Sequence, residues 1–226
     1  MADKKQVMEK DHNEAVIEKA KDIWNRFQKP IVITATIIII AIGGYYGYKN
    51  FVQKPNEEKA VDAIFKAEEY YRLDSLQKAL NGDGLNFGFI KVIDKYGNTK
   101  MGNLARFYAG DCLLRTGDYT NAVKYLKDFS TDSKQVQARA YKLLGDAYAE
   151  LDKNEEAISS YKKAANHFTD DNTNAAEYLF FAAALAEKTG KTKEAIVLYQ
   201  QLKDKYPGTT QSNDADKYLG KLGVYN

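Results

Sequence analysis

The sequence predicts an all-α protein, made of a single transmembrane helix followed by an α-solenoid. The first observation is an uncharged apolar run from Pro30 to Tyr48. The second is a set of three similar segments in the C-terminal half, spaced by about the length of one helical pair. The order along the chain is therefore a charged tail over residues 1–29, an anchor over residues 30–49 and a repeat domain over residues 57–226.

The apolar run has the length and composition of a membrane-spanning helix. Eight of its residues are isoleucine or valine, and residues 31–48 would span about 27 Å as a helix, close to the hydrocarbon thickness of a bilayer. Aromatic residues stand near both ends, as is typical of the two membrane interfaces. They are Trp24 and Phe27 on one side and Tyr45, Tyr46 and Tyr48 on the other. We therefore expect the lipid bilayer to contact residues 30–48.

Other interpretations fit part of this pattern. The β-branched residues would suit a buried strand, although so long a charge-free strand is unusual in a soluble domain. A cleaved signal peptide needs a short basic leader and small residues at its cleavage site, whereas here 29 residues of mixed charge come first and GGYYGY follows. Gly43 and Gly47 form a GxxxG pair that could bring two anchors together as a homodimer, or they could simply reflect how common glycine is in membrane helices.

The tail contains an amphipathic segment. Its apolar residues recur mostly at spacings of three and four, and they are Val16, Ala20, Ile23, Trp24 and Phe27. This predicts a helix that lies on the membrane surface or continues into the anchor until Pro30 bends it, with a solvated lead-in that has no partner as the alternative. Residues 1–11 are expected to be disordered. A slight basic bias around the anchor favours a cytoplasmic tail.

Composition argues against several classes of function. The 33 basic and 31 acidic residues nearly balance, so nothing indicates nucleic-acid binding. Cys112 is the only cysteine, which rules out an intrachain disulfide, and no phosphate-binding, hydrolase or zinc-protease motif is present. His12 and His167 are far apart and are interpreted as surface residues. We therefore expect no enzyme activity, no cofactor and no metal site.

Two helices are expected between the anchor and the repeats. Residues 57–80 read as one helix with an apolar face, and the NGDG sequence at 81–84 ends it. A second helix is expected over about 85–96, where Phe89, Val92, Ile93 and Tyr96 recur at helical spacing.

The repeated segments are residues 118–130, 153–165 and 191–203, which align without gaps. Each contains an alanine at the same place, and twelve residues before each alanine lies another small residue. The pairs are Gly110 with Ala122, Gly145 with Ala157, and Ala183 with Ala195. Two antiparallel helices can cross closely where their side chains are small, so we expect each pair to meet at the crossing. Gly117 and Gly190 should end first helices, and Asn154 and Thr192 should cap second helices.

These residues resemble the tetratricopeptide repeat family, whose pattern W-x2-L-G-x2-Y, A-x3-F and P recurs about every 34 residues. The closest unit has Tyr141, Leu144, Gly145, Tyr148, Ala157, Tyr161 and Ala164 at the matching positions. The resemblance implies units at about 66–99, 103–136, 138–171 and 176–209, the first being a weak match. Residues 213–222 are expected to form a capping helix, which such stacks need for solubility.

Stacked helical pairs leave a concave surface lined by the first helix of each unit. The register places nine residues there: Tyr70, Asp74, Phe107, Asp111, Arg139, Lys142, Asp146, Glu177 and Phe180. Aromatic residues beside mixed charges would suit an extended peptide, although these residues could equally just complete the solenoid surface. Some family members clamp a peptide's C-terminal carboxylate with Lys, Asn and Arg. Phe107 and Asp111 occupy corresponding positions here, which argues against that mode.

The order of tail, anchor and repeats also resembles the bacterial ancillary subunit family of the SecYEG translocon, in its Bacteroidetes-type form. The stretches that carry the resemblance are YYRLDSLQKALNGDG and FGFIKVIDKYGNTKMGNLARFYAGD. It implies a scaffold in the bacterial inner membrane with a cytoplasmic N-terminus and a periplasmic C-terminal domain. The implied partners are Sec translocon subunits, periplasmic chaperones and nascent secretory chains. The alternative function is that of an adaptor for envelope assembly or cell division.

Overall fold

The computed structural model describes the backbone of residues 2–225 and the side chains of residues 17–21 and 23–225. Every regular element in this described range is a helix, which confirms the predicted all-α class. The chain divides into two compact units, Met1–Pro55 and Asn56–Asn226, and each is described by itself.

The N-terminal unit is a long helix followed by a short π-helix. Helix α1 covers Ala2–Tyr48 with Pro30 inside it, and η1 covers Lys49–Gln53. The expectation of disorder is therefore wrong for residues 2–11, because no glycine or proline interrupts the tail and Ala, Glu and Lys favour helix. The predicted apolar position Val16 and the surface residue His12 lie outside the residues whose side chains are described.

The apolar part of α1 is helical and carries exposed apolar side chains. Ile37 to Ile40 are each more than half exposed, and transfer of such side chains from water to an apolar environment is favourable. Ile17–Arg72, which joins α1, η1 and the following helix, is long and apolar enough to cross a membrane. A side chain built on Gly43 or Gly47 would meet nothing within 4 Å, so these glycines leave a flat strip on the helix.

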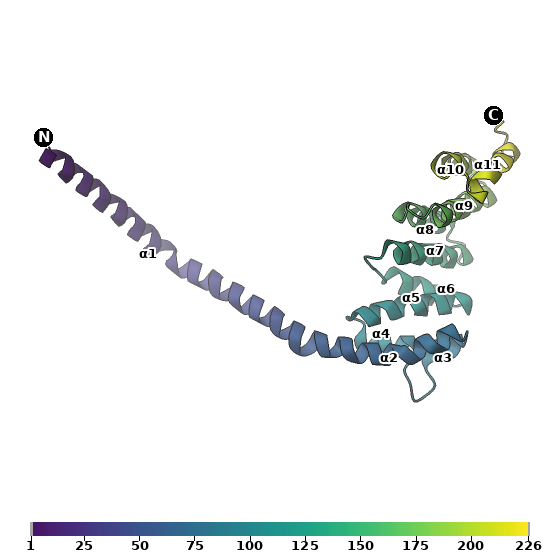
Figure 1. Ribbon diagram of the computed structural model, residues 1–226, viewed down its shortest axis with the longest axis horizontal. Coiled ribbons are helices and arrows are strands. Elements are labelled where there is room, and N and C mark those ends of the chain that lie inside the picture. The colour runs from purple at the N-terminus through teal and green to yellow at the C-terminus, as the bar shows by residue number, and fades with distance from the viewer. Residues whose placement is uncertain (1, 226) are drawn as a thin grey trace. The chain divides into compact units, whose positions relative to one another are not determined.

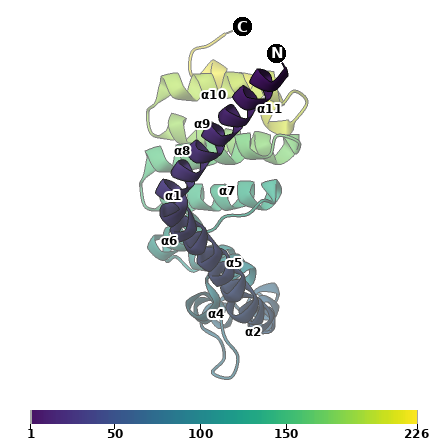
Figure 2. The same ribbon diagram turned by 90° about the vertical axis from the view of Figure 1, so that its left-hand side faces the viewer.

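The C-terminal unit is a stack of helices laid one above another, as Figures 1 and 2 show from two directions. The helices are α2 (Lys54–Arg72), α3 (Leu76–Asn81), α4 (Phe89–Tyr96), α5 (Lys100–Arg115), α6 (Tyr119–Lys127), α7 (Lys134–Glu150), α8 (Asn154–His167), α9 (Asn172–Lys188), α10 (Thr192–Lys205) and α11 (Thr210–Lys221). The pairs α5–α6, α7–α8 and α9–α10 are antiparallel hairpins, and α11 packs on α9 and α10.

The start of this unit differs from the sequence expectation. The helix predicted over residues 57–80 is two helices, because Asp74 adopts a left-handed conformation with φ 57° and ends α2. The predicted helix over 85–96 begins only at Phe89. The amide groups of Leu85 and Asn86 donate to the Asp83 carboxylate, so they support a loop instead of a first helical turn.

Helix ends follow the predicted chemistry only in part. Gly117 and Gly190 have positive φ and terminate α5 and α9, as expected. Asn154 and Thr192, however, are the first helical residues of α8 and α10, and neither helix has a side-chain cap. Side-chain caps occur instead at other helices, where an oxygen accepts a hydrogen bond from the amide three residues on. They are Thr99, Asp118, Asp171 and Thr209.

In the α5–α6 and α7–α8 pairs the helices approach closely at a glycine, but its neighbour is not the predicted alanine. A side chain on Gly145 would lie 2.6 Å from the ring of Tyr161, and one on Gly110 would lie 2.5 Å from Leu126. In both units this neighbour comes one helical turn after the repeat alanine, Ala157 or Ala122. The glycine therefore makes room for a large side chain from the partner helix, while the alanines are fully buried nearby.

Tyr161 also links the core to the surface of the stack. Its ring is buried against Gly145, and its hydroxyl donates a 2.9 Å hydrogen bond to Asp146. The other carboxylate oxygen of Asp146 accepts a 2.8 Å bond from Lys142. Burial, with the nearby charge of Asp146, raises the pKa of Tyr161 far above its usual value.

Gly145→Ala is expected to destabilise the repeat unit by about 1–3 kcal/mol, because the added methyl group overlaps a buried ring that cannot swing away. Gly220→Ala in α11 is the matched control, since nothing lies within 4 Å of its added methyl group. The measurement is chemical denaturation of the full-length chain in detergent. Equal stabilities of the two variants would contradict the packing described here.

The domain should lose stability above about pH 10, where tyrosine ionises in the unfolded chain but Tyr161 keeps its proton in the folded one. Unfolding then releases a proton, so the free energy of unfolding falls as pH rises. Tyr161→Phe should be less stable at neutral pH but should show a shallower decline, by up to about 1.4 kcal/mol per pH unit. Tyr225→Phe, at an exposed position, should leave the profile unchanged. Identical slopes for wild type and Tyr161→Phe would contradict the assignment.

Candidate protein-binding surface

Two of the residues predicted to face a partner are core residues. Phe107 is 5% exposed and packs with Leu126, Phe129 and Leu143 between α5, α6 and α7. Asp111 is also 5% exposed and accepts a hydrogen bond from the hydroxyl of Tyr71 in α2. Neither side chain is available to a ligand, and truncating Phe107 would report on stability rather than on binding.

Three further predicted residues serve other contacts. Tyr70 donates a 2.7 Å hydrogen bond to Asp83 in the loop after α3. Asp74 forms an ion pair with Arg115 at the end of α5. The ring of Phe180 packs against Tyr218 of α11, with 5.3 Å between ring centroids, so it belongs to the C-terminal cap.

The other four predicted residues come together. Arg139, Lys142 and Asp146 lie on α7, and Glu177 lies on α9. Burial raises the pKa of Tyr178, as do the negative charges of Glu177 and Asp146, whereas the Arg139 charge opposes the shift. The charges of Arg139, Asp146 and Glu177 therefore act on the same tyrosine, and the Lys142 ammonium group lies 5.1 Å from the ring centroid of Phe181 on α9. We call the surface formed by Arg139, Lys142, Asp146, Glu177, Tyr108 and Phe181 the inner face.

Aromatic residues that the sequence analysis missed complete the inner face. Tyr108 is half-buried, and its pKa is raised by burial and by Glu68, while Arg72 and Arg139 lower it. Phe181 is half-buried, with the Lys142 ammonium group 5.1 Å from its ring centroid and the Tyr161 ring beside it. The only sequence signal for Tyr108 and Phe181 is that each directly follows a phenylalanine, in the pairs Phe107–Tyr108 and Phe180–Phe181.

The inner face is pre-organised at one of its carboxylates, that of Asp146. Asp146 is held between Lys142 and Tyr161, so its orientation is fixed before any partner arrives. Arg139 is exposed, and its guanidinium group lies 5.9 Å from the centroid of the Phe107 ring. A surface of fixed charges beside apolar rings can bind both the charged and the apolar side chains of an extended segment.

A groove lies on the side of the stack formed by the second helix of each pair, α6, α8 and α10. This groove, of about 640 Å³, runs between α6, α7 and α8, and its lining includes Tyr141, Tyr148, Ser159 and Lys163. It continues toward α10 through a neighbouring hollow that shares Tyr141 and Lys163. This surface offers a competing position for a partner.

Groups suited to catalysis or metal binding are scarce. Among residues 17–21 and 23–225 no cluster of three metal-ligating side chains occurs. Burial raises the pKa of the Cys112 thiol to about 12, so this cysteine is protonated at neutral pH and is a poor nucleophile.

Comparison with known families supports the repeat architecture. Sequence models of the tetratricopeptide repeat match residues 104–132, 138–166 and 177–209, which fall on α5 to α10. A search of curated proteins gave no match to this sequence. The chain therefore contains tetratricopeptide repeats, whose stacked helices characteristically present extended surfaces to protein partners.

Proposed function

We propose that this protein is a membrane-anchored scaffold that binds an extended protein segment on its inner face. The exposed isoleucines of α1 support the anchor, because their transfer from water to an apolar environment is favourable. The flat strip at Gly43 and Gly47 gives a second copy's anchor a surface to pack on, so the anchor can also support a homodimer.

The observation that carries the binding proposal is the charge arrangement between α7 and α9. Lys142 and Asp146 are paired and Arg139 is exposed beside them, so the surface presents both signs of charge within one patch. Rim charges of this kind steer encounter and select the register of a partner. Phe181 and Tyr108 add half-buried rings that can accept apolar side chains.

At a finer level, the proposed partner machinery is the SecYEG translocon, with periplasmic chaperones or nascent secretory chains as the bound proteins. The support is the sequence resemblance of residues 70–84 and 87–111 to its ancillary subunit family. An adaptor for envelope assembly or cell division is the competing proposal, and it shares the same anchor and the same inner face.

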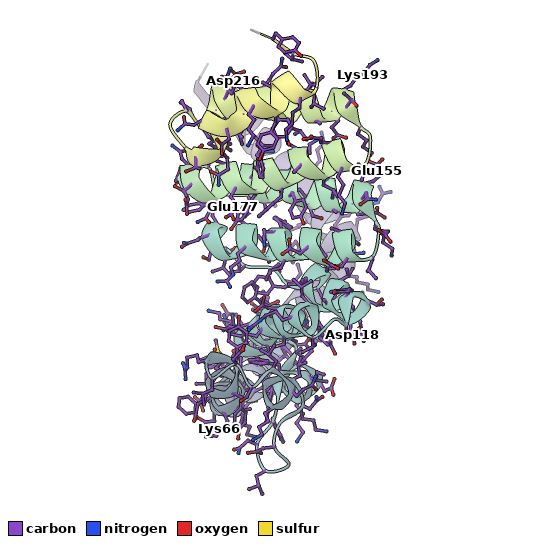
Figure 3. All side chains as sticks on the ribbon, turned by 90° about the vertical axis from the view of Figure 1, so that its right-hand side faces the viewer. Lys66, Asp118, Glu155, Glu177, Lys193 and Asp216 are labelled. Carbon is purple, nitrogen blue, oxygen red and sulfur yellow. The ribbon has the colours of Figure 1, made fainter. Side chains whose placement is uncertain are left out.

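Affinity purification of the full-length chain from mild detergent should recover Sec subunits together with a substrate or chaperone. Arg139→Glu reverses an exposed charge on the inner face and should weaken recovery of the bound protein, while the melting temperature stays nearly unchanged. Lys193→Glu is the control, because Lys193 and Glu177 lie at opposite edges of the stack (Figure 3).

Two outcomes would redirect the proposal. Loss of the partner on Lys163→Glu but not on Arg139→Glu would move the binding site to the groove between α6, α7 and α8. Consistent absence of Sec subunits, with mid-cell localisation of the protein, would favour the division adaptor.

The proposed topology has residues 1–29 in the cytoplasm and the repeat unit in the periplasm of a bacterial inner-membrane protein. It is supported by the slight basic bias beside Lys29 and by the translocon resemblance. The test fuses a reporter enzyme after residue 226. A reporter that works only in the periplasm should show activity there. Activity of a cytoplasm-only reporter at the same position would reverse the topology.

A further inference from the structure

The two ends of the helical stack differ in chemistry. At the C-terminal end, the exposed residues of α11 are all polar: Thr210, Asn213, Asp214, Asp216, Lys217 and Lys221. At the other end, α2 exposes Val61 and Phe65, which lie one helical turn apart, and the Phe65 side chain is 62% exposed. A terminal repeat normally carries a polar outer face. The α2 end therefore exposes two apolar side chains among charged ones, whereas every exposed residue of α11 is polar.

A loop with an apolar tip extends from the α2 end of the stack. Figures 1 and 2 show the connection between α3 and α4 protruding beyond α2, away from the rest of the stack. Leu85 lies in this loop and is 92% exposed, more than any other large apolar side chain in the described residues. Single exposed apolar side chains are common on protein surfaces, but covering one this exposed with another apolar surface is favourable.

Close backbone packing and hydrogen bonds to Asp83 order the loop that carries Leu85. Its two ends pass so close that a side chain on Gly88 would lie 2.3 Å from the carbonyl oxygen of Leu80. Asp83 then accepts hydrogen bonds from the amides of Leu85 and Asn86, at 2.9 and 2.6 Å, and from the Tyr70 hydroxyl of α2 at 2.7 Å. The tip is thus tied to α2 and is ordered before it meets a partner.

Along the chain, the α2 end of the stack follows shortly after the apolar run. Helix α2 begins at Lys54, six residues after Tyr48, so even a fully extended connection would separate them by only about 21 Å. The connection is also easy to bend. It contains the π-helix η1 and then Pro55, which has no amide hydrogen to donate.

We propose that the loop over residues 82–88 contacts the lipid bilayer, with Leu85 inserted at the membrane interface. The proposal rests on α1 spanning that bilayer. The charged residues behind the tip include Lys59, Lys66 and Asp62, so both signs of charge are present. Contact therefore depends on the apolar tip and does not require anionic lipid.

The test places a fluorescent probe at the loop tip of the full-length chain. Trp24 is the only tryptophan, so Trp24→Phe gives a background without tryptophan, into which Leu85→Trp is introduced. The protein is reconstituted in phosphatidylcholine nanodiscs with or without bromine on the acyl chains. The expected result is a blue-shifted emission that loses most of its intensity in the brominated lipid. Adding phosphatidylserine should change neither effect.

The matched control is Asp214→Trp in the same background, on the polar end of the stack. Its emission should be red-shifted and insensitive to bromine. Asp83→Ala combined with Leu85→Trp removes the hydrogen bonds that order the tip, so the quenching should weaken. Phe65→Trp gives a second probe of the α2 end if Leu85→Trp impairs folding, and it should also be quenched.

The proposal is overturned if the probe at position 85 stays red-shifted and unquenched while the protein remains in the nanodisc. A blue shift of the emission at position 85 that appears only after a membrane protein is added would also overturn the proposal. That result would assign the loop tip to a contact with a protein. Failure of the chain to enter the nanodisc is a different result, because it refutes the anchor and with it the membrane part of the proposed function.

Discussion

The close contact between a glycine on one helix and a large side chain on the next sets the geometry of the repeat unit. At Gly145 the Tyr161 ring occupies space that any side chain would need, and at Gly110 Leu126 does the same. Because interiors are close-packed, this contact fixes both the separation and the rotation of the paired helices. The same tyrosine reaches Asp146, so the packing of the core also fixes a carboxylate on the inner face.

This coupling explains why some predicted binding residues are available and others are not. A carboxylate that accepts a buried hydroxyl serves the structure, as Asp111 does for Tyr71. Asp146 supports the core and is also part of the inner face. One of its carboxylate oxygens accepts a hydrogen bond from Tyr161, and the other accepts one from Lys142 at the surface. The inner face therefore has one carboxylate held in place, while Arg139 is exposed on the same helix. A group that is already held in place loses less conformational entropy when it binds a partner.

The two ends of the stack also expose different kinds of side chain. Its last helix, α11, closes the core with a polar exterior, while α2 follows the anchor in the chain and leaves Val61 and Phe65 exposed. A soluble repeat protein needs polar surfaces at both ends. The helix that precedes α2 in the chain is long and apolar enough to cross a membrane. The unequal ends are consistent with the apolar composition of residues 30–48.

The sequence alone determined the all-α class, the apolar helix and the positions of the helical hairpins from α5 to α10, because hydrophobic periodicity, small residues and turn glycines are local signals. It also predicted Arg139, Lys142, Asp146 and Glu177 as partner-facing residues, and this stays a prediction. Only the tertiary structure decided that Phe107 is buried and Tyr108 half-buried, since adjacent helical residues point about 100° apart and these two are equally suited to either side. The break at Asp74 and the loop around Asp83 likewise depend on hydrogen bonds and ion pairs to distant partners such as Arg115 and Tyr70, which no local pattern encodes.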